Sequence, residues 1–180
     1  MQAALEDWIP LALGSIGHIN APRGWMAEGD AGDSGSAAAL APDGKARLMV
    51  HAVIHDAKAM GADFAERMQA AADRIISHFA EQAGAEPPEI SSIAGAARPI
   101  LEIHAIFFDD AERPRFRIRQ WHALAPLDAA AARIAVLAFS LMTPALLPLQ
   151  GSAPLAAGFQ QGLRAAAAAL SDGENATISL

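Results

Sequence analysis

The chain has 180 residues, which is enough for one domain with a substantial hydrophobic core. Hydrophobic residues make up 53% and charged residues 18%, a composition that excludes disorder over most of the chain. The net charge of -7 argues against non-specific nucleic-acid binding, and the absence of cysteine excludes disulfides, thiolate metal sites and a cysteine nucleophile.

The N-terminal segment MQAALEDWIPLALGSIG carries only acidic charges, whereas a secretory signal begins with basic residues. The longest uncharged apolar run, 134–149, contains two prolines and falls short of the roughly 18 apolar residues that a membrane-spanning helix needs. We therefore expect a cytoplasmic protein without a membrane span.

The predicted elements follow the order strand, hairpin, helix, hairpin, strand, helix. We expect an N-terminal extension or short helix over 1–13, a single domain over 14–170 and a flexible tail over 171–180. Within the domain, the sequence predicts a strand at 15–22, a loop at 26–36, a hairpin turning at 42–45, a helix at 63–83, a loop at 86–92, a hairpin of strands 100–108 and 115–124, a strand at 133–142 and a helix at 154–170.

Local signals support these assignments. The turn PDGK supplies Pro42 and Gly44, which suit the tight turn of a hairpin. The segment 63–83 carries apolar residues at helical spacing, with Asp63 as a candidate N-cap. The run at 133–142 shows neither the strand period nor the helix period clearly, and we favour a central strand over a helix.

The strands fall into antiparallel hairpins with two helices inserted between them. This order favours an α+β fold over a doubly wound parallel one. We expect one domain with an antiparallel sheet of about five to six strands flanked by helices. Its edge strands need cover, which homodimerisation would supply.

The segment HAVIH places His51 and His55 four residues apart. On a helix such a pair could share a zinc ion, but the segment follows a turn and contains β-branched residues, which favours a strand. Four residues of strand span about 13 Å, too far for two histidines to bind one ion. The helical metalloprotease motif HExxH also needs a glutamate where Ala52 stands.

A shared metal site would therefore need ligands from a second strand. Glu102 and His104 alternate onto one face of the strand at 100–108, and His51 would converge with them if the strands were adjacent and their faces matched. His122 could add to such a cluster. The alternative is that all are half-buried sheet residues without a ligand. The sequence predicts no other cofactor.

The segment GDSGS at 32–36 is similar to the surroundings of serine-hydrolase nucleophiles. Ser34 would need histidine and aspartate partners in a chain order that this sequence does not provide, so we favour a flexible loop. The sequence contains no GxSxG, P-loop or GxGxxG motif.

Arg115, Arg117 and Arg119 alternate onto one face of the strand at 115–124, and Trp121 continues that face. Such a row could bind a carboxylate or a phosphate, or dock an acidic segment of a partner protein. The alternative is a solvated or salt-bridged sheet face.

The order of elements over about residues 14–170 resembles the PsbP-like superfamily. The turn Pro22–Trp25 is similar to a Pro-x-Gly-Trp-like turn of that family, and Gly95–Pro99 stands where members carry a Gly-x-Pro-like entry to a strand. The superfamily is an α/β/α sandwich that includes the photosystem II extrinsic subunit, a Ran-binding import factor and type VI secretion effector-associated chaperones. Its members are mostly non-catalytic, so the resemblance implies a docking role and carries over no catalytic residue.

We therefore expect a non-enzymatic binding or chaperone-like domain that docks a protein segment on its sheet face or in a helix groove, with the arginine row and Trp121 as candidate contacts. The alternative is a metal-binding protein or hydrolase that uses His51, Glu102 and His104. A small-molecule carrier, the third possibility, would need a closed apolar pocket.

Overall fold

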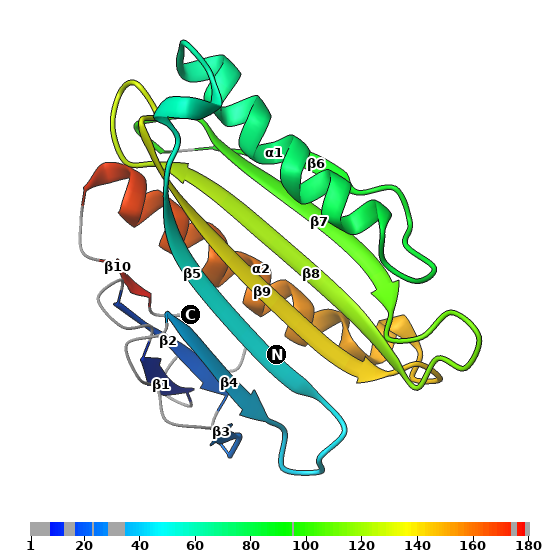
Figure 1. The fold of residues 1–180 in the computed structure, drawn as a ribbon. Coiled ribbons are helices and arrows are strands. Elements are labelled where there is room, and N and C mark those ends of the chain that lie inside the picture. Colours follow the sequence, from blue (N-terminus) through cyan, green and yellow to red (C-terminus); the bar gives the residue numbers. More distant parts are fainter. Residues whose placement is uncertain are drawn as a thin grey trace.

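The computed structural model describes residues 8–12, 17–22, 24–28, 35–94, 96–173 and 176–178. It contains a seven-stranded antiparallel sheet in the order β3-β4-β5-β9-β8-β7-β6 (Figure 1). The strands of this sheet are β3 (Met26–Glu28), β4 (Ser36–Leu40), β5 (Arg47–Asp56), β6 (Glu89–Ile93), β7 (Ile100–Phe108), β8 (Phe116–Pro126) and β9 (Arg133–Pro144).

Two helices pack on the large sheet, α1 (Phe64–Ala80) and α2 (Leu149–Asp172), and a short 3-10 helix, η3 (Lys58–Met60), precedes α1. A smaller sheet in the order β1-β2-β10 lies beside them. Its strands are β1 (Trp8–Ala12), β2 (Gly17–Pro22) and β10 (Ala176–Ile178), with β10 parallel to β2.

The chain builds the large sheet from its two edges toward the middle. β3, β4 and β5 form one meander, after which α1 carries the chain to the opposite edge (Figure 1). β6 to β9 return as a second meander, so that β9 pairs with β5 over ten residue pairs. The centre of the sheet therefore joins two segments that lie far apart in the sequence.

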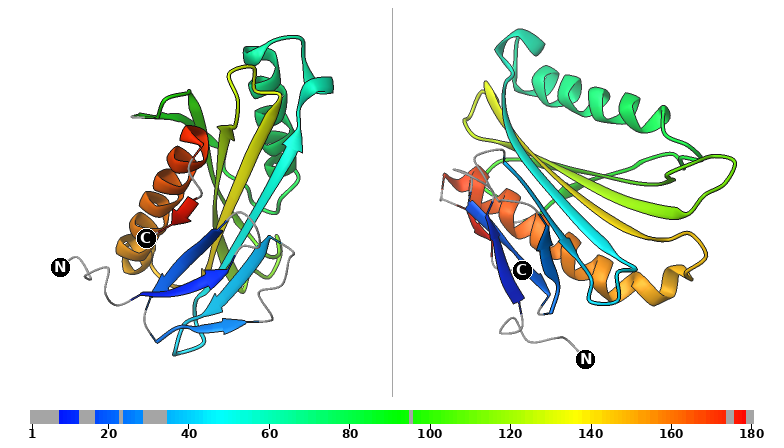
Figure 2. Two further views of the ribbon diagram at one scale, coloured as in Figure 1. Left: turned by 90° about the vertical axis from the view of Figure 1, so that its left-hand side faces the viewer. Right: turned by 60° about the horizontal axis from the view of Figure 1, so that its bottom comes forward.

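The two helices cover opposite faces of the large sheet (Figure 2). The core under α2 includes Trp121, Leu137, Phe139, Phe159 and Leu163. The core under α1 includes Met68, Phe79, Ile103, Phe107, Leu124 and Ile134. Because side chains alternate along each strand, successive residues of β8, and likewise of β9, point to different cores.

The start of α1 is fixed by reciprocal capping. The Asp63 carboxylate accepts a hydrogen bond from the Glu66 N–H at 3.0 Å, and the Glu66 carboxylate accepts one from the Ala62 N–H at 2.6 Å. From there α1 packs along β7 and β8 rather than over β5. The placement of this helix leaves part of the sheet face beside it uncovered.

A buried ion pair ties α2 to β7. Arg164 on α2 donates two hydrogen bonds to the Glu102 carboxylate, at 2.6 and 3.0 Å, and the Gln160 amide donates a third at 2.5 Å. Glu102 is only 2% exposed, whereas the Arg164 side chain is 46% exposed. The hydrogen bond to Glu102 raises the pKa of Arg164, so the guanidinium stays charged.

The structure confirms a single α+β domain with an antiparallel sheet and two packed helices. The PDGK hairpin, the helix capped by Asp63 and the hairpin of β7 and β8 lie where the sequence predicts them. The ambiguous run at 133–142 is a strand, within β9. Its position between β5 and β8 explains its continuous apolar character, because both of its faces are covered.

The predicted number of strands was too low. The added strand β3 lies within the segment 26–36, and β6 covers the end of the segment 86–92 and extends to Ile93; the sequence predicted both segments as loops. Each pairs with one neighbour only, at an edge of the sheet, and most of its side chains are exposed. Such short edge strands carry little of the apolar alternation that identifies a strand in sequence.

The predicted boundaries at both ends also need correction. Trp8 begins β1, so a helix over 1–13 is wrong there, and residues 1–7 lie outside the described residues. The final helix begins at Leu149 rather than 154 and ends at Asp172, and the predicted tail contains β10. None of the helices in the described ranges combines the length and apolar character needed to cross a membrane.

The buried ion pair gives a stability prediction. Replacing Arg164 by leucine leaves the Glu102 carboxylate buried without its counter-charge, and we expect the free energy of unfolding to fall by about 3 kcal/mol. Urea denaturation of the purified variant measures this loss. The double variant Glu102→Leu/Arg164→Leu removes both charges and should recover most of the stability. A single variant as stable as the wild type would contradict the role assigned to the pair.

Candidate functional site

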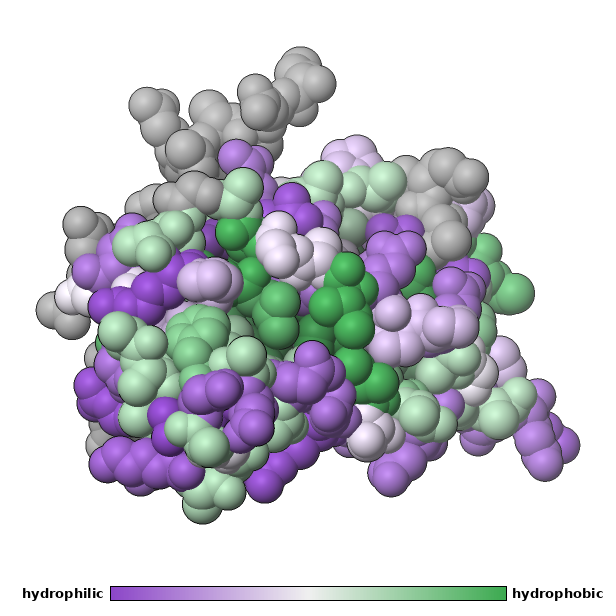
Figure 3. All heavy atoms as spheres, turned by 90° about the horizontal axis from the view of Figure 1, so that it is seen from above, coloured by the Kyte–Doolittle hydropathy of each residue, from purple (hydrophilic) through white to green (hydrophobic). Residues whose placement is uncertain are grey.

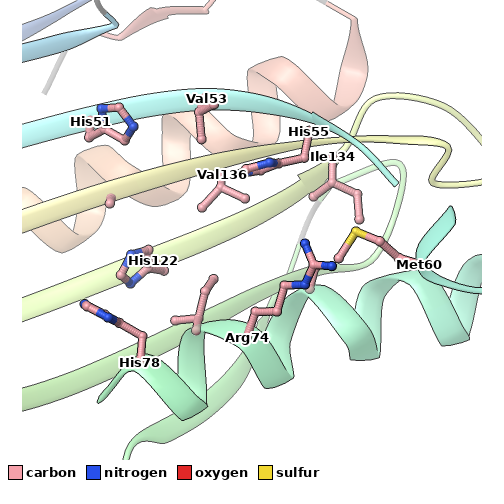
Figure 4. A pocket seen from close by; sticks show the side chains of 12 residues that line it. His51, Val53, His55, Met60, Arg74, His78, His122, Ile134 and Val136 are labelled. Carbon is pink, nitrogen blue, oxygen red and sulfur yellow. The ribbon is translucent and has the colours of Figure 1, made fainter. Parts of the chain in front are cut away.

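A cavity of about 400 Å³ lies between α1 and the strands β5, β9 and β8 (Figure 4). Its lining combines residues of all four elements and of η3: His51, Val53, His55, Met60, Ala71, Arg74, Ile75, His78, His122, Ile134, Val136 and Ala138. Its size falls within the roughly 300–1,000 Å³ typical of ligand sites. We take this cavity as the candidate functional site.

The cavity exists because small residues occupy its floor and one wall. In the paired strands, His51 on β5 faces Ala138 on β9, and Ala138 faces His122 on β8. The two histidines are therefore two strand spacings apart, about 10 Å between Cα atoms, with only a methyl group between them. Ala71 of α1 adds another small side chain. In the described part of the chain, no side chain fills the space that this row leaves.

The walls of the cavity are apolar and its polar groups are basic. Val53, Ile75, Ile134 and Val136 supply branched aliphatic surface. Among the described residues, the polar ones that line the cavity are four histidines and one arginine, and none is a carboxylate. Figure 3 shows a strip of hydrophobic residues in the middle of one face of the molecule, flanked by hydrophilic residues.

Strand pairing places a hydroxyl group against one of these histidines. Ser36 on β4 is the register partner of His51, and its Oγ lies 2.6 Å from His51 Nδ1. The contact holds the imidazole ring in one orientation. Among the described residues, no carboxylate contacts His51, so the pair lacks the third member of a catalytic triad. Ser34 of the GDSGS segment lies outside the described residues.

His122 is the most deeply buried polar group of the cavity, at 8% exposure. Its ring packs edge-to-face on Phe79 with centroids 5.3 Å apart, and its Nδ1 has no hydrogen-bond partner. Burial, with smaller contributions from the neighbouring His78 and His51, lowers the pKa of His122 to about 4. His122 is therefore a neutral imidazole at pH 7.

The proton of neutral His122 is best placed on Nε2. A buried N–H without a partner is costlier than a buried lone pair without one, and Nδ1 is the nitrogen that is buried and unpaired. In this tautomer, the Nε2–H group is the one with which His122 meets a ligand as a hydrogen-bond donor.

The structure does not bring His51, Glu102 and His104 together. Glu102 and His104 share a face of β7, as predicted, but this face lies toward α2, whereas His51 lines the cavity on the α1 side. Two strands, β9 and β8, also separate β5 from β7. The predicted convergence is wrong because it required adjacent strands and matching faces, and neither condition holds.

Both β7 residues have structural contacts instead. Glu102 is bound by Arg164, and His104 stacks on Trp121 with ring centroids 5.1 Å apart and an interplanar angle of 10°. His104 Nδ1 also lies 3.7 Å from the Glu89 carboxylate. Within the described ranges, no group of three or more histidine, aspartate or glutamate side chains is placed to hold a metal ion.

The predicted partner contacts, Arg115, Arg117, Arg119 and Trp121, do not form one exposed row. Trp121 is 2% exposed beneath α2, so it is unavailable to a partner, and its proposed contact role is wrong. Arg117 donates to the Leu147 carbonyl at 2.9 Å, and Arg115 lies 4.0 Å from Asp109. Burial and the nearby Arg117 lower the pKa of Arg119. A partner-binding role of the three arginines stays a prediction.

The sequence did not indicate the residues that α1 contributes to the cavity. Arg74 and His78 lie four residues apart on α1 and so share one side of the helix. Their spacing is visible in the sequence, but nothing local shows that this side of the helix faces β5. The contact between Ser36 and His51 likewise depends on strand register.

The burial of His122 predicts a pH dependence of stability. The pKa of about 4 in the folded protein lies below the ordinary value of 6.5, so the unfolded chain binds the proton more readily. The stability that depends on neutral His122 is therefore complete above pH 6.5 and is lost as the pH falls toward 4. When the pH is lowered from 7 to 4.5, the free energy of unfolding falls in both proteins. We expect this fall to be about 2 kcal/mol smaller in His122→Phe than in the wild type.

Urea denaturation at the two pH values measures the difference, since phenylalanine keeps an aromatic ring against Phe79 but cannot titrate. Equal losses in wild type and variant would show that His122 is not the buried neutral group described.

Comparison with models of known protein families and with curated proteins finds no match to this chain. What the protein does must therefore follow from the chemistry of the cavity and from the faces of the sheet that surround it.

Proposed function

We propose that this protein is a non-enzymatic binding domain that docks an apolar segment of a partner protein in the cavity between α1 and the sheet. The observation that carries the proposal is the partly uncovered face of β5, where Val53 lines an open cavity together with Ile134 and Val136 of β9. Burying such surface against an apolar side chain of a partner is favourable by about 25 cal/mol per Å².

The polar groups of the cavity support binding rather than catalysis. His51 is engaged by Ser36 without a carboxylate behind it, and His122 is a neutral ring held in the core by Phe79. A nucleophile in this place would need an activated hydroxyl group and an aligned base. A few placed donors in an apolar cavity are instead what fixes the orientation of a bound group.

The arrangement of elements also supports placement in the PsbP-like superfamily. The resemblance rests on the order strand, hairpin, helix, hairpin, strand, helix, and the structure has a hairpin, one helix, the strands β7 to β9 and a closing helix in this order, with β6 added before β7. The helices on opposite faces of the sheet agree with an α/β/α sandwich (Figure 2). Because members of that superfamily are mostly docking proteins, the placement favours a protein segment as the occupant.

The proposal is tested by filling the cavity. Peptides are selected from a displayed random library on the wild-type protein, and their dissociation constants are measured for three variants. Val53→Trp places an indole in the cavity and should weaken binding by about ten-fold or more. Ala138→Leu, on the floor, should act in the same direction. Both effects follow from loss of the space that an apolar side chain needs.

The matched control is Ile54→Trp. Ile54 is the next residue of β5 and is 46% exposed, but strand alternation turns it away from the cavity. This variant adds the same indole to the same strand and should bind the selected peptides like the wild type. Selected peptides that bind Val53→Trp and Ala138→Leu without loss would show that the cavity is not the docking site.

A further inference from the structure

The cavity contains a positive charge, whereas the whole protein is acidic. The chain carries a net charge of -7, yet among the described residues the ionisable ones that line the cavity are Arg74 and four histidines and include no carboxylate. Arg74 carries a permanent positive charge, and the histidines can donate hydrogen bonds. A permanent cation without an acidic neighbour in the lining points to a negatively charged group beside the apolar one.

Arg74 is the permanent cation of this set. It projects from α1 toward the sheet and lines the cavity (Figure 4). Within the part of the chain that the structure describes, its guanidinium makes no hydrogen bond or ion pair. Its five N–H groups are therefore available to a ligand, and a carboxylate is the group that matches them best.

Other arginines of the protein are already engaged. Arg67, two turns earlier on α1, donates to the carbonyls of Gly61, Ala62 and Ala130 at 3.0, 3.2 and 2.7 Å. Arg164 binds Glu102 in the ion pair described above. Arg67 stabilises the start of the helix and Arg164 the opposite face, whereas Arg74 stabilises neither, which leaves its charge for an external partner.

A second donor faces the same space. In the tautomer deduced above, Nε2 of His122 carries the proton, so the cavity offers an N–H group from the sheet as well as the guanidinium from α1. Both groups donate hydrogen bonds, and neither can accept one in this state. A ligand that presents only acceptors, such as a carboxylate, satisfies both.

We infer that the docked segment carries an aspartate or glutamate next to its apolar anchor residue, and that Arg74 binds this carboxylate while the anchor fills the cavity. The inference rests on the proposed docking function and specifies the chemistry of the partner. Some of the peptides selected on the wild-type protein will bind the Val53→Trp variant more weakly. The inference predicts that these peptides are enriched in an acidic residue beside an apolar one.

The test is a double-mutant cycle on one such peptide. Its acidic residue is replaced by the corresponding amide, and both peptides are titrated against wild type, Arg74→Glu and Arg74→Gln by fluorescence anisotropy. We expect Arg74→Glu to weaken the acidic peptide by about ten-fold or more and the amide peptide by less than about two-fold. Arg74→Gln should show an intermediate loss, again for the acidic peptide only.

The matched control is Arg113→Glu. Arg113 lies in the exposed turn between β7 and β8, away from the cavity residues, and its replacement changes the net charge of the protein by the same amount. It should leave both peptides bound as in the wild type. If Arg74→Glu and Arg113→Glu lost the same affinity for the acidic peptide, the overall charge of the protein would explain the loss, and the inference would be overturned.

Other outcomes separate this inference from the proposed function. Selected peptides that bind Val53→Trp more weakly than the wild type, but bind Arg74→Glu as tightly as the wild type, would overturn the carboxylate contact and leave the docking function standing. Peptides insensitive to Val53→Trp would overturn the docking function itself. Calorimetric binding of decanoate at the cavity, with no peptide selected, would contradict a protein segment as the occupant.

Discussion

The antiparallel pairing of β5 with β9 determines which side chains of this protein meet. The two strands come from meanders that approach from opposite edges of the sheet, and their ten residue pairs close it in the middle. Since side chains alternate along a strand, this register sends His51 and Val53 to the α1 face and Val50 and Ala52 to the α2 face. A shift by one residue would exchange the two sets.

The two faces of the sheet consequently have different roles. On the α2 side, the helix closes a continuous apolar core, and the only buried carboxylate there, within the described ranges, is neutralised by Arg164. On the α1 side, the helix packs along β7 and β8 and leaves β5 partly uncovered. The α2 face contributes a closed core to stability, whereas the α1 face contains an open cavity that histidines and Arg74 line.

Much of the fold follows from local signals in the sequence, but the candidate site does not. The capped helix after Asp63 and the PDGK turn are encoded within a few residues, so periodicity and turn chemistry find them. The sequence also predicted correctly that Glu102 and His104 lie on the same face of one strand. Which helix covers that face, and which strands are neighbours, depends on tertiary packing, and the predicted cluster with His51 fails for that reason. The cavity depends on the same information, because Ala138 separates His51 from His122 only once β9 lies between β5 and β8.

Methyl NMR of the protein with a selected peptide tests the central claim most directly, namely that the α1 face is the docking face. With labelled isoleucine, leucine and valine methyl groups, we predict shifts for Val53, Ile75, Ile134 and Val136, which line the cavity. Methyl groups of the opposite core, such as those of Leu137 and Leu163, should stay in place. Shifts confined to that core, or to the exposed edge residue Ile90 of β6, would contradict docking in the cavity.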